Sequence, residues 1–372
     1  MRRILSLTLV ALTVSLGVST ALAQDAPPAV QPTWADLEPG VWTNIPGAEG
    51  TICATGTPYS FYVRPASQHS EKLLIHFQGG GACWMGQNCD RNARPTYDAF
   101  VDESDDPTGN LGIGDFDNPE NPFTDYNMVF APYCTGDVHL GSSVSTYPSA
   151  DSEVEINHNG FDNATSVLAW TFENIPTASD VFVTGCSAGS IPSPFYVLPV
   201  AAAYQGARIV QLGDASGSYR NVTGILTELF RTWGTFGILD ENFAGIEEDA
   251  LTFESLYMVM GNLFPDVQFA QYNAAFDMVQ TGFIILAGLG SPNTLEMLQA
   301  NHDDIRAALD QENFHAFTAG GSTHCITVTP DMYTFAADGV RFVDWITALA
   351  NGDPLDDVAC TGDCRKVETI EP

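Results

Sequence analysis

Apolar and polar positions along this chain alternate between strand-like and helix-like spacing. Short apolar runs predict strands at "SFYVR" (60–64), "KLLIHFQ" (72–78), "YNMVFAPY" (126–133), "DVFVTG" (180–185) and "ARIVQLGD" (207–214). Between them, "NATSVLAWTFEN" has the apolar spacing of a helix. Strands that alternate with helices usually pair in parallel and are covered on both faces. The pattern therefore predicts an α/β fold with a mostly parallel sheet.

The chain after residue 220 predicts more helix than strand. Residues 221–297 carry helix-like amphipathic segments rich in Phe, Leu and Met, and predict a helical insertion that supplies a lid or a pocket wall. "NFHAFTAGG" (313–321) predicts a last strand, and "GVRFVDWITALANG" (339–352) predicts a closing helix that ends at Gly352. We expect residues 41–372 to form one domain that contains this insertion.

The N-terminus has the pattern of an export signal. Two arginines, an uncharged apolar run and Ala-Leu-Ala at 21–23 predict a signal peptide over 1–23. The apolar run is too short and too interrupted for a membrane span, and no later segment offers roughly 18 uncharged apolar residues. The Pro- and Ala-rich residues that follow predict a flexible lead-in over 24–40. We expect a secreted protein, periplasmic or extracellular, without a stable membrane anchor.

Charge and cysteine content narrow the partners and the compartment. The formal net charge of −33 repels phosphates, which argues against nucleic acid and anionic membranes as partners. Eight cysteines fit an oxidising compartment, and close spacing predicts the pairs Cys83–Cys89 and Cys360–Cys364. A zinc site is disfavoured because the thiols are scattered and no CxxC pair exists. The acidic stretch 102–122 predicts a solvated loop rather than a calcium site, since its spacing fits no EF-hand.

The stretch "VFVTGCSAGS" (181–190) places Ser187 between Gly185 and Gly189, directly after a predicted strand. In a GxSxG turn the glycines let strand and helix close tightly, so that a strained serine protrudes as a nucleophile. The alternative is a tight structural turn, because GxSxG also occurs by chance. The preceding strand and the helix-compatible segment that follows favour the nucleophile.

A second glycine-rich element, "HFQGGGACW" (76–84), follows an early strand. Such a loop lets backbone N–H groups approach a substrate oxygen. We predict Gly80, Gly81 and Ala188 as oxyanion donors, each worth about 3 kcal/mol of transition-state stabilisation. The alternative, a phosphate-binding loop, lacks the P-loop lysine and would meet few nucleotides outside the cell.

The base should be a histidine that follows Ser187, given the order serine, acid, histidine of α/β hydrolases. His302 lies in a polar helix-like segment and His315 lies inside a strand pattern, where packing or surface roles are expected. His324 lies in a loop of small residues just past that strand, where a base can reach a nucleophile. We therefore predict His324 as the base.

Two aspartates are candidates for the residue that orients this base. Asp214 ends a predicted strand, which suits the topology. Asp277 lies in an apolar helix-like stretch, where a carboxylate is costly to bury unless it is paired. Orienting His324 would supply that pairing. The pattern alone does not separate the two.

Together these motifs resemble the pectin acetylesterase family, which includes the Notum carboxylesterases. The resemblance runs from about Cys53 to Gly352, and this sequence is similar to the bacterial branch of the family. The family pairs its GxSAG serine with an aspartate in an NAAxDxxQ-like segment and a histidine in an HC segment. This implies Ser187, Asp277 and His324, and it favours Asp277 over Asp214. The resemblance is carried by "CATGTPYSFYVRP", "FQGGGACW", "NPFTDYNMVFAPYCTGDVHLG", "HNGFDNATSVLAW", "VTGCSAGS", "LGDASGSY", "NAAFDMVQ" and "THCITVTP".

Two positions depart from the family pattern. The family's GGGWC loop is GGGACW here, with Ala82 where an aromatic is usual, and SAGG reads SAGS, with Ser190 where a glycine is usual. Both positions are expected close to the acyl pocket. The substrate therefore need not be one of the family's best-known ones.

Cys186 and Cys325 flank the predicted nucleophile and base. If Ser187 and His324 meet, these two cysteines are close in space, and a disulfide between them would staple the site. Cys53 and Cys134 would then be the remaining pair.

The predicted protein is a secreted serine esterase with an α/β-hydrolase-like fold. Ser187 attacks an ester carbonyl, His324 takes and returns the proton, and Asp277 orients His324. This chemistry requires no cofactor and no metal. The resemblance implies a short acyl ester, such as acetyl on a polysaccharide. The acyl group, the polymer and the oligomeric state stay open.

Three alternative functions compete with this prediction. Within the hydrolases they are a lipid or protein deacylase, with a deeper apolar pocket built by the 221–297 helices, and a polyester hydrolase. From another class, a non-catalytic binding protein could retain the fold. The complete set of Ser187, Asp277 and His324 argues against a binding protein, because binding does not need all three.

Overall fold

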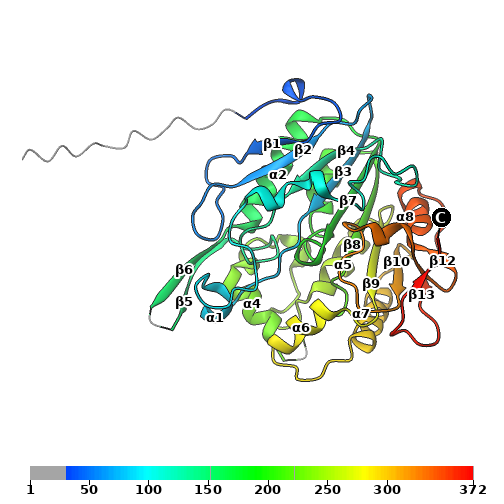
Figure 1. Ribbon diagram of the computed structural model, residues 1–372. Coiled ribbons are helices and arrows are strands. Elements are labelled where there is room, and N and C mark those ends of the chain that lie inside the picture. Colours follow the sequence, from blue (N-terminus) through cyan, green and yellow to red (C-terminus); the bar gives the residue numbers. More distant parts are fainter. Residues whose placement is uncertain (1–30, 151, 222, 372) are drawn as a thin grey trace, which may run out of the picture. The chain divides into compact units, whose positions relative to one another are not determined.

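A nine-stranded sheet forms the centre of the computed structural model, which describes residues 31–150, 152–221 and 223–371 (Figure 1). The first two strands run antiparallel to their neighbours and the other strands pair in parallel, as the pattern predicted. In spatial order the strands are β1 (Thr43–Pro46), β2 (Ser60–Arg64), β4 (Asn127–Ala131), β3 (Lys72–Phe77), β7 (Asp180–Cys186), β8 (Arg208–Asp214), β9 (Gln268–Ala274), β10 (Phe314–Ala319) and β13 (Val358–Ala359).

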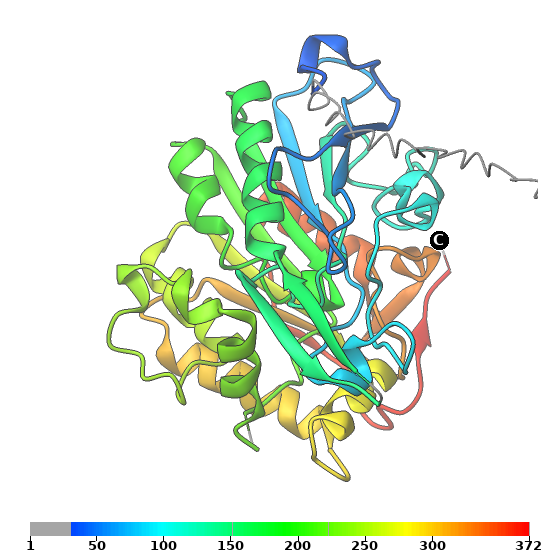
Figure 2. The ribbon, with the colours of Figure 1, turned by 90° about the vertical axis from the view of Figure 1, so that its left-hand side faces the viewer.

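Helices cover both faces of this sheet because successive strand residues point to opposite sides. In β3, Leu73 and Ile75 enter the core under helices α2 (Gly160–Asn174) and α3 (Val197–Ala203), whereas Leu74 enters the core under α8 (Phe342–Asn351). Figure 2 shows the two green helices side by side along one face. The other helices are α1 (Gly86–Cys89), α4 (Ile225–Trp233), α5 (Phe253–Leu263), α6 (Met278–Leu286) and α7 (Thr294–Ala308).

Two small sheets lie outside the central one. A hairpin is formed by β5 (Ser143–Pro148) and β6 (Glu153–His158). Near the C-terminus, β11 (Phe335–Ala337) pairs with β12 (Val340–Arg341) and β14 (Glu368–Thr369).

The strand and helix predictions up to residue 214 are confirmed, and so is the closing helix. Helix α8 ends at Asn351, and Gly352 caps it in the left-handed conformation with a φ of 73°. Glycine adopts this conformation without a steric penalty, which is why it ends helices so often.

The helical insertion predicted over 221–297 is only partly correct. Helices α4 and α5 lie there, but β9 (Gln268–Ala274) follows them as a central strand between β8 and β10. The strand was missed because it carries Gln271 and Asn273, which are buried and hydrogen-bonded inside the protein. Polar residues at central positions hide the apolar run that normally marks a buried parallel strand.

Part of the predicted flexible lead-in is attached to α2. The backbone N–H of Trp34 donates to the Asn174 side chain at 2.9 Å, and the Trp170 indole donates to the carbonyl of Pro32 at 3.0 Å. From residue 31 on, the lead-in therefore differs from the expectation. The predicted signal peptide (1–23) and residues 24–30 lie outside the described residues. Among the helices that the structure describes, none has both the length and the apolarity to cross a membrane.

All four predicted disulfides are present. The pairs are Cys53–Cys134, Cys83–Cys89, Cys186–Cys325 and Cys360–Cys364. Four disulfides are typical of an oxidising compartment.

Candidate active site

Ser187 lies at the C-terminal end of β7, in a strained turn. Its φ of 53° falls in the left-handed region, which is uncommon for residues that carry a Cβ. A Cβ at Gly185 would lie 2.2 Å from the carbonyl oxygen of Gly189, and one at Gly189 would lie 2.0 Å from that of Phe77. Only glycine permits this close approach of β7, the turn and the end of β3. The GxSxG stretch thus has the strained strand-to-helix geometry in which a serine hydroxyl protrudes.

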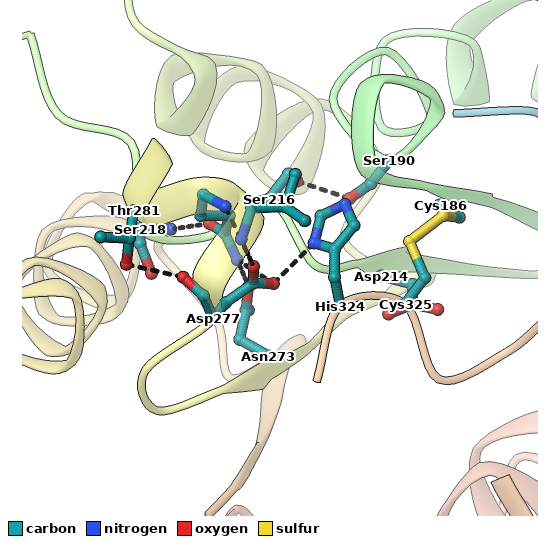
Figure 3. Close-up of polar contacts among 12 residues, drawn as sticks. Cys186, Ser190, Asp214, Ser216, Ser218, Asn273, Asp277, Thr281, His324 and Cys325 are labelled. Carbon is teal, nitrogen blue, oxygen red and sulfur yellow. Dashed lines mark hydrogen bonds and ion pairs between the residues drawn. A yellow bond between two sulfur atoms is a disulfide. The ribbon is translucent and has the colours of Figure 1, made fainter. Parts of the chain in front are cut away.

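His324 and Asp277 form a direct pair (Figure 3). The distance from His324 Nδ1 to Asp277 Oδ2 is 2.7 Å, and Asp277 is fully buried. The opposite ring nitrogen of His324, Nε2, is buried and has no hydrogen-bond partner among the described residues. His324 and Ser187 line the same hollow. The fold therefore brings Ser187, His324 and Asp277 to one place.

Asp277 is placed by the end of β9 and the start of α6. Its carboxylate accepts hydrogen bonds from the N–H groups of Val279 (2.8 Å) and Gln280 (3.0 Å), and from Gln280 Nε2 (3.1 Å). A helix N-terminus favours negative charge, so these contacts offset the cost of burying the carboxylate. The prediction of a helix-like stretch around Asp277 is therefore wrong in detail, because Asp277 precedes the helix and caps it.

Gln280 is a site residue that the sequence reasoning did not single out. Its Oε1 accepts from the N–H of Ser218 at 2.8 Å, while its Nε2 reaches both Asp277 and Asn273. The amide thus fixes the buried carboxylate from a second side. The available signal was its place in "NAAFDMVQ", one helical turn after Asp277.

Asp214 supports the loop that carries His324. It accepts from the N–H groups of Ile326 (2.9 Å) and Thr327 (2.8 Å) and from Thr327 Oγ1 (2.6 Å). Burial raises the pKa of Asp214 to about 6, although these hydrogen bonds oppose the shift. Within the described residues, hydrogen bonds link His324 to Asp277 and not to Asp214. The geometry thus separates the two acids that the pattern left equal.

The Cys186–Cys325 disulfide anchors the same loop on the other side. It joins the residue before Ser187 to the residue after His324, and Figure 3 shows it beside the histidine. Cys325 itself has a φ of 59°, an uncommon backbone conformation for a non-glycine residue. The loop is thus held by a covalent bond and by the Asp214 carboxylate.

The glycine-rich loop lies directly against Ser187. Gly80 and Gly81 have φ values of 151° and 82°, which favour glycine. A Cβ at Gly81 would lie 1.9 Å from the carbonyl oxygen of Thr96, and one at Gly79 would lie 3.0 Å from Ser187 Cβ. Gly80 and Gly81 line a hollow beside Ser187, and Ala188 lines the adjoining pocket. Their role as oxyanion donors stays a prediction.

Gln78 is a second residue that the sequence reasoning missed. Its Oε1 accepts from the N–H of Tyr133 at 2.9 Å, and its Nε2 donates to Asp105 Oδ1 at 2.8 Å. Its backbone carbonyl lies 2.9 Å from His139 Nε2. Gln78 therefore links the glycine-rich loop to the acidic loop through its side-chain hydrogen bonds. A polar residue at the end of an apolar strand was the signal.

The two other histidines that follow Ser187 pack away from the site. His302 Nε2 lies 3.1 Å from Gln271 Oε1, and His315 Nε2 lies 2.8 Å from Gln268 Oε1. Burial lowers the pKa of His302 to about 3, so it stays neutral. These positions match the predicted packing roles.

An apolar pocket, here called the acyl pocket, opens beside Ser187. Helices α4, α5 and α6 supply much of its wall, as predicted for the 221–297 segment. Of the two departures from the family pattern, Ala82 lines this pocket. Ser190 does not, because its hydroxyl is buried against the hydroxyl of Ser216 at 2.5 Å (Figure 3). The main side chains that line the acyl pocket are Trp84, Ile191, Leu229, Trp233, Phe253 and Phe283.

A second hollow, here called the acid-walled hollow, shares only Ser187 and Gly81 with the acyl pocket. It lies between the acidic loop 104–110 and the ends of β3, β4 and β7. Across the described ranges, no group of three or more His, Cys, Asp or Glu side chains is arranged to hold a metal ion. The side chains that line the acid-walled hollow include His76, Gln78, Asp105, Asp106, Phe130 and His324.

A comparison with known families and proteins gives consistent matches. The sequence profile described as "Pectinacetylesterase" matches residues 40–242. Palmitoleoyl-protein carboxylesterase NOTUM of Schmidtea mediterranea is 35% identical over 104 residues, 27% of this chain and 20% of that protein. The Homo sapiens protein of the same name is 34% identical over 94 residues, 24% of this chain and 18% of that protein.

A third relative has a name that bears on activity. The "inactive palmitoleoyl-protein carboxylesterase notum1b" of Danio rerio is 32% identical over 96 residues, 25% of this chain and 68% of that protein. The chain thus spans about a fifth of the first two relatives and about two thirds of the third. Since one relative is named inactive, likeness alone does not establish activity, and the geometry of the site must support it. Membership of a bacterial branch stays a prediction.

Proposed function

Because this chain belongs to the pectinacetylesterase family, we propose that it is a secreted serine carboxylesterase with Ser187, His324 and Asp277 as its catalytic residues. One observation carries the proposal. The fully buried Asp277 has its Oδ2 2.7 Å from Nδ1 of His324. His324 lines the same hollow as the strained Ser187. Export is supported by the four disulfides.

In the proposed reaction, His324 Nε2 takes the proton of the Ser187 hydroxyl as its Oγ attacks the ester carbonyl. N–H groups of Gly80, Gly81 and Ala188 stabilise the resulting oxyanion. The C–O bond to the alcohol breaks, His324 returns the proton to that alcohol, and the acyl group stays on Ser187. Water then repeats the sequence and releases the carboxylic acid. Asp277 stabilises the imidazolium that forms in each half-reaction.

The acyl group we propose is short, with acetyl on a polysaccharide as the first candidate by resemblance. The acyl pocket favours a second candidate, a lipid or protein deacylase. Its lining is almost entirely apolar, which suits a longer alkyl chain. The names of the NOTUM relatives, palmitoleoyl-protein carboxylesterases, agree with that candidate. A polyester hydrolase would use the same pocket.

Labelling with a fluorophosphonate probe tests the proposed nucleophile. We expect wild type to label and Ser187→Ala to lose both labelling and turnover, the latter by on the order of a million-fold. Ser152→Ala is the matched control, because Ser152 is exposed in the turn between β5 and β6. If wild type neither labels nor hydrolyses any ester, the non-catalytic binding protein becomes the better description.

Acyl chain length separates the candidate substrates. Nitrophenyl acetate, butyrate and octanoate differ only in the group that enters the acyl pocket. A kcat/KM that falls from acetate to octanoate supports a deacetylase. A rise toward octanoate supports the deacylase instead.

A further inference from the structure

The acid-walled hollow is the natural place for the half of the substrate that leaves. An ester has an acyl half and an alcohol half on either side of the attacked carbonyl. The acyl pocket and the acid-walled hollow meet only at Ser187 and Gly81. If the acyl half occupies the apolar pocket, the alcohol half lies in the hollow, next to His324, which returns the proton to it.

Negative charge dominates this hollow. Asp106 is exposed on its wall, and Asp105 is buried there, where it accepts hydrogen bonds from Gln78 Nε2 and from the N–H of Asp102 (both 2.8 Å). Burial raises the pKa of Asp105, although its hydrogen bonds from the N–H of Asp102 and from Gln78 oppose the shift. The other titratable groups in the lining are His76 and His324, and the lining contains no Lys or Arg.

His76 is a buried polar side chain in the same lining. It is 3% exposed, and neither of its ring nitrogens has a hydrogen-bond partner in the part of the chain that the structure describes. Its ring stacks on Phe130, with 5.2 Å between the centroids and 8° between the planes. Burial lowers the pKa of His76 to about 3, with a smaller effect of His139 in the same direction.

A neutral imidazole offers one donor and one acceptor, which a hydroxyl group can match. Leaving both nitrogens unpaired costs free energy, so these atoms require an explanation. The carboxylates of the wall are hydrogen-bond acceptors for further hydroxyls, and Phe130 adds apolar ring surface. Carboxylate ligands are instead usually bound by Arg or Lys.

Resting on the esterase function proposed above, we propose that the acid-walled hollow binds the alcohol half of the ester and selects a neutral, hydroxyl-rich sugar unit over a uronate. A uronate would bring its own carboxylate beside Asp105 and Asp106 without a cation to pair with it. A neutral sugar presents hydroxyls to the same carboxylates and to His76.

The test compares two forms of one polymer. Acetylated polygalacturonate is negatively charged, and its methyl-esterified form is neutral with the same acetyl groups. Released acetate is measured at low salt with a chelator present, so that divalent cations do not bridge carboxylates. We expect kcat/KM to be about tenfold higher on the neutral form, and the ratio to shrink at 0.5 M salt, where charges are screened within a few ångströms.

Two variants test whether the hollow causes the preference for the neutral polymer over the charged one. Asp106→Asn should lower the ratio about two- to threefold, the effect of removing one charge roughly 8 Å away in water. Asparagine retains the N-cap that Asp106 provides to Thr108 N–H at 2.9 Å. Asp117→Asn is the matched control, since Asp117 is exposed in the same acidic segment but does not line the hollow. It should leave the ratio unchanged.

A third variant tests the histidine. His76→Phe keeps the stack on Phe130 and removes the ring nitrogens. It should raise KM for the neutral polymer several-fold more than KM for nitrophenyl acetate, because the nitrophenyl group has no hydroxyl to pair with the ring nitrogens of His76. If the protein does not fold, His76→Leu, which also has no side-chain donor or acceptor, replaces it and should give the same rise in KM.

The outcomes separate the two proposals. Absence of nitrophenyl acetate hydrolysis would overturn the esterase function, and this inference with it. Hydrolysis of nitrophenyl acetate together with equal or faster turnover of the charged polymer would overturn the substrate class alone. An equal ratio for Asp106→Asn and Asp117→Asn would overturn the assignment to the hollow.

Discussion

The acyl pocket and the acid-walled hollow are built from different kinds of structure. The acyl pocket is formed largely by helices, whose side chains such as Leu229 and Trp233 also belong to the main core. The hollow is formed by an acidic loop fixed through side-chain hydrogen bonds such as Gln78 to Asp105. Ser187 thus faces an apolar wall on one side and a wall with acidic side chains on the other.

This contrast suggests how substrate preference is divided. Burial of alkyl groups depends on apolar area and shape, so we expect the acyl pocket to set the preferred chain length. Hydrogen bonding and charge depend on chemical identity, so we expect the hollow to set the preference for the alcohol. Changes on one side should leave the preference on the other side intact, and changes to the shared residues should affect both.

The largest expected effect in this set comes from Asp277, which acts through His324 and so affects both sides of Ser187 alike. Asp277→Asn should lower kcat/KM by roughly ten-thousand-fold for every ester, because the amide no longer selects the productive tautomer of His324. Asp214→Asn should act mainly on stability, by about 1 to 3 kcal/mol, since it weakens hydrogen bonds to the loop of Ile326 and Thr327. Kinetics and thermal unfolding of both variants distinguish these roles. Equal losses of kcat would contradict the assignment.

A smaller effect should be confined to the acyl side. Leu229 lines the acyl pocket from α4, and Leu229→Phe narrows it. We expect the ratio of kcat/KM for the longest accepted acyl ester to that for acetate to fall 10- to 100-fold. The preference for neutral over charged polymer should not change. Leu198→Phe, on α3 outside the pocket lining, is the control. A changed alcohol preference would show that the two sides are coupled.

The smallest expected effect concerns the stability of the acyl wall. Glu254 follows Phe253 on α5, it is buried, and its Oε2 has no partner in the described ranges. Burial raises its pKa to about 7. A raised carboxyl pKa contributes stability that is fully present below the unfolded pKa near 4.5 and is lost as pH rises through 7.

The free energy of unfolding of Glu254→Gln, measured relative to wild type, should therefore rise by about 1 to 2 kcal/mol from pH 4.5 to pH 8. Denaturant unfolding at both pH values measures this difference. Exposed Glu247→Gln is the control and should show no such gain. A difference that is independent of pH would show that Glu254 does not titrate in this range.

Much of the fold and part of the site could be predicted locally. Period-two and helical spacing located β2, β3, β4, β7, β8 and α8, because side-chain direction follows directly from backbone geometry. The strained turn at Ser187 was recognisable from its glycines, since the steric reason for them lies within a few residues. Strand β9 was hidden because Gln271 and Asn273 find their partners only after folding.

Contacts between distant segments were decided only by the tertiary structure. The choice between Asp277 and Asp214 depends on hydrogen bonds that span 47 residues to His324 and 112 residues to Ile326. Asp214 is the last residue of β8 and Asp277 follows the end of β9, so both lie at the carboxyl ends of parallel strands, and local pattern cannot separate them. The sequence by itself determined the strands with continuous apolar runs, the strained turn at Ser187 and the acidic character. The pairing of buried polar groups was decided by the fold, because a buried carboxylate is stable only where distant donors converge on it.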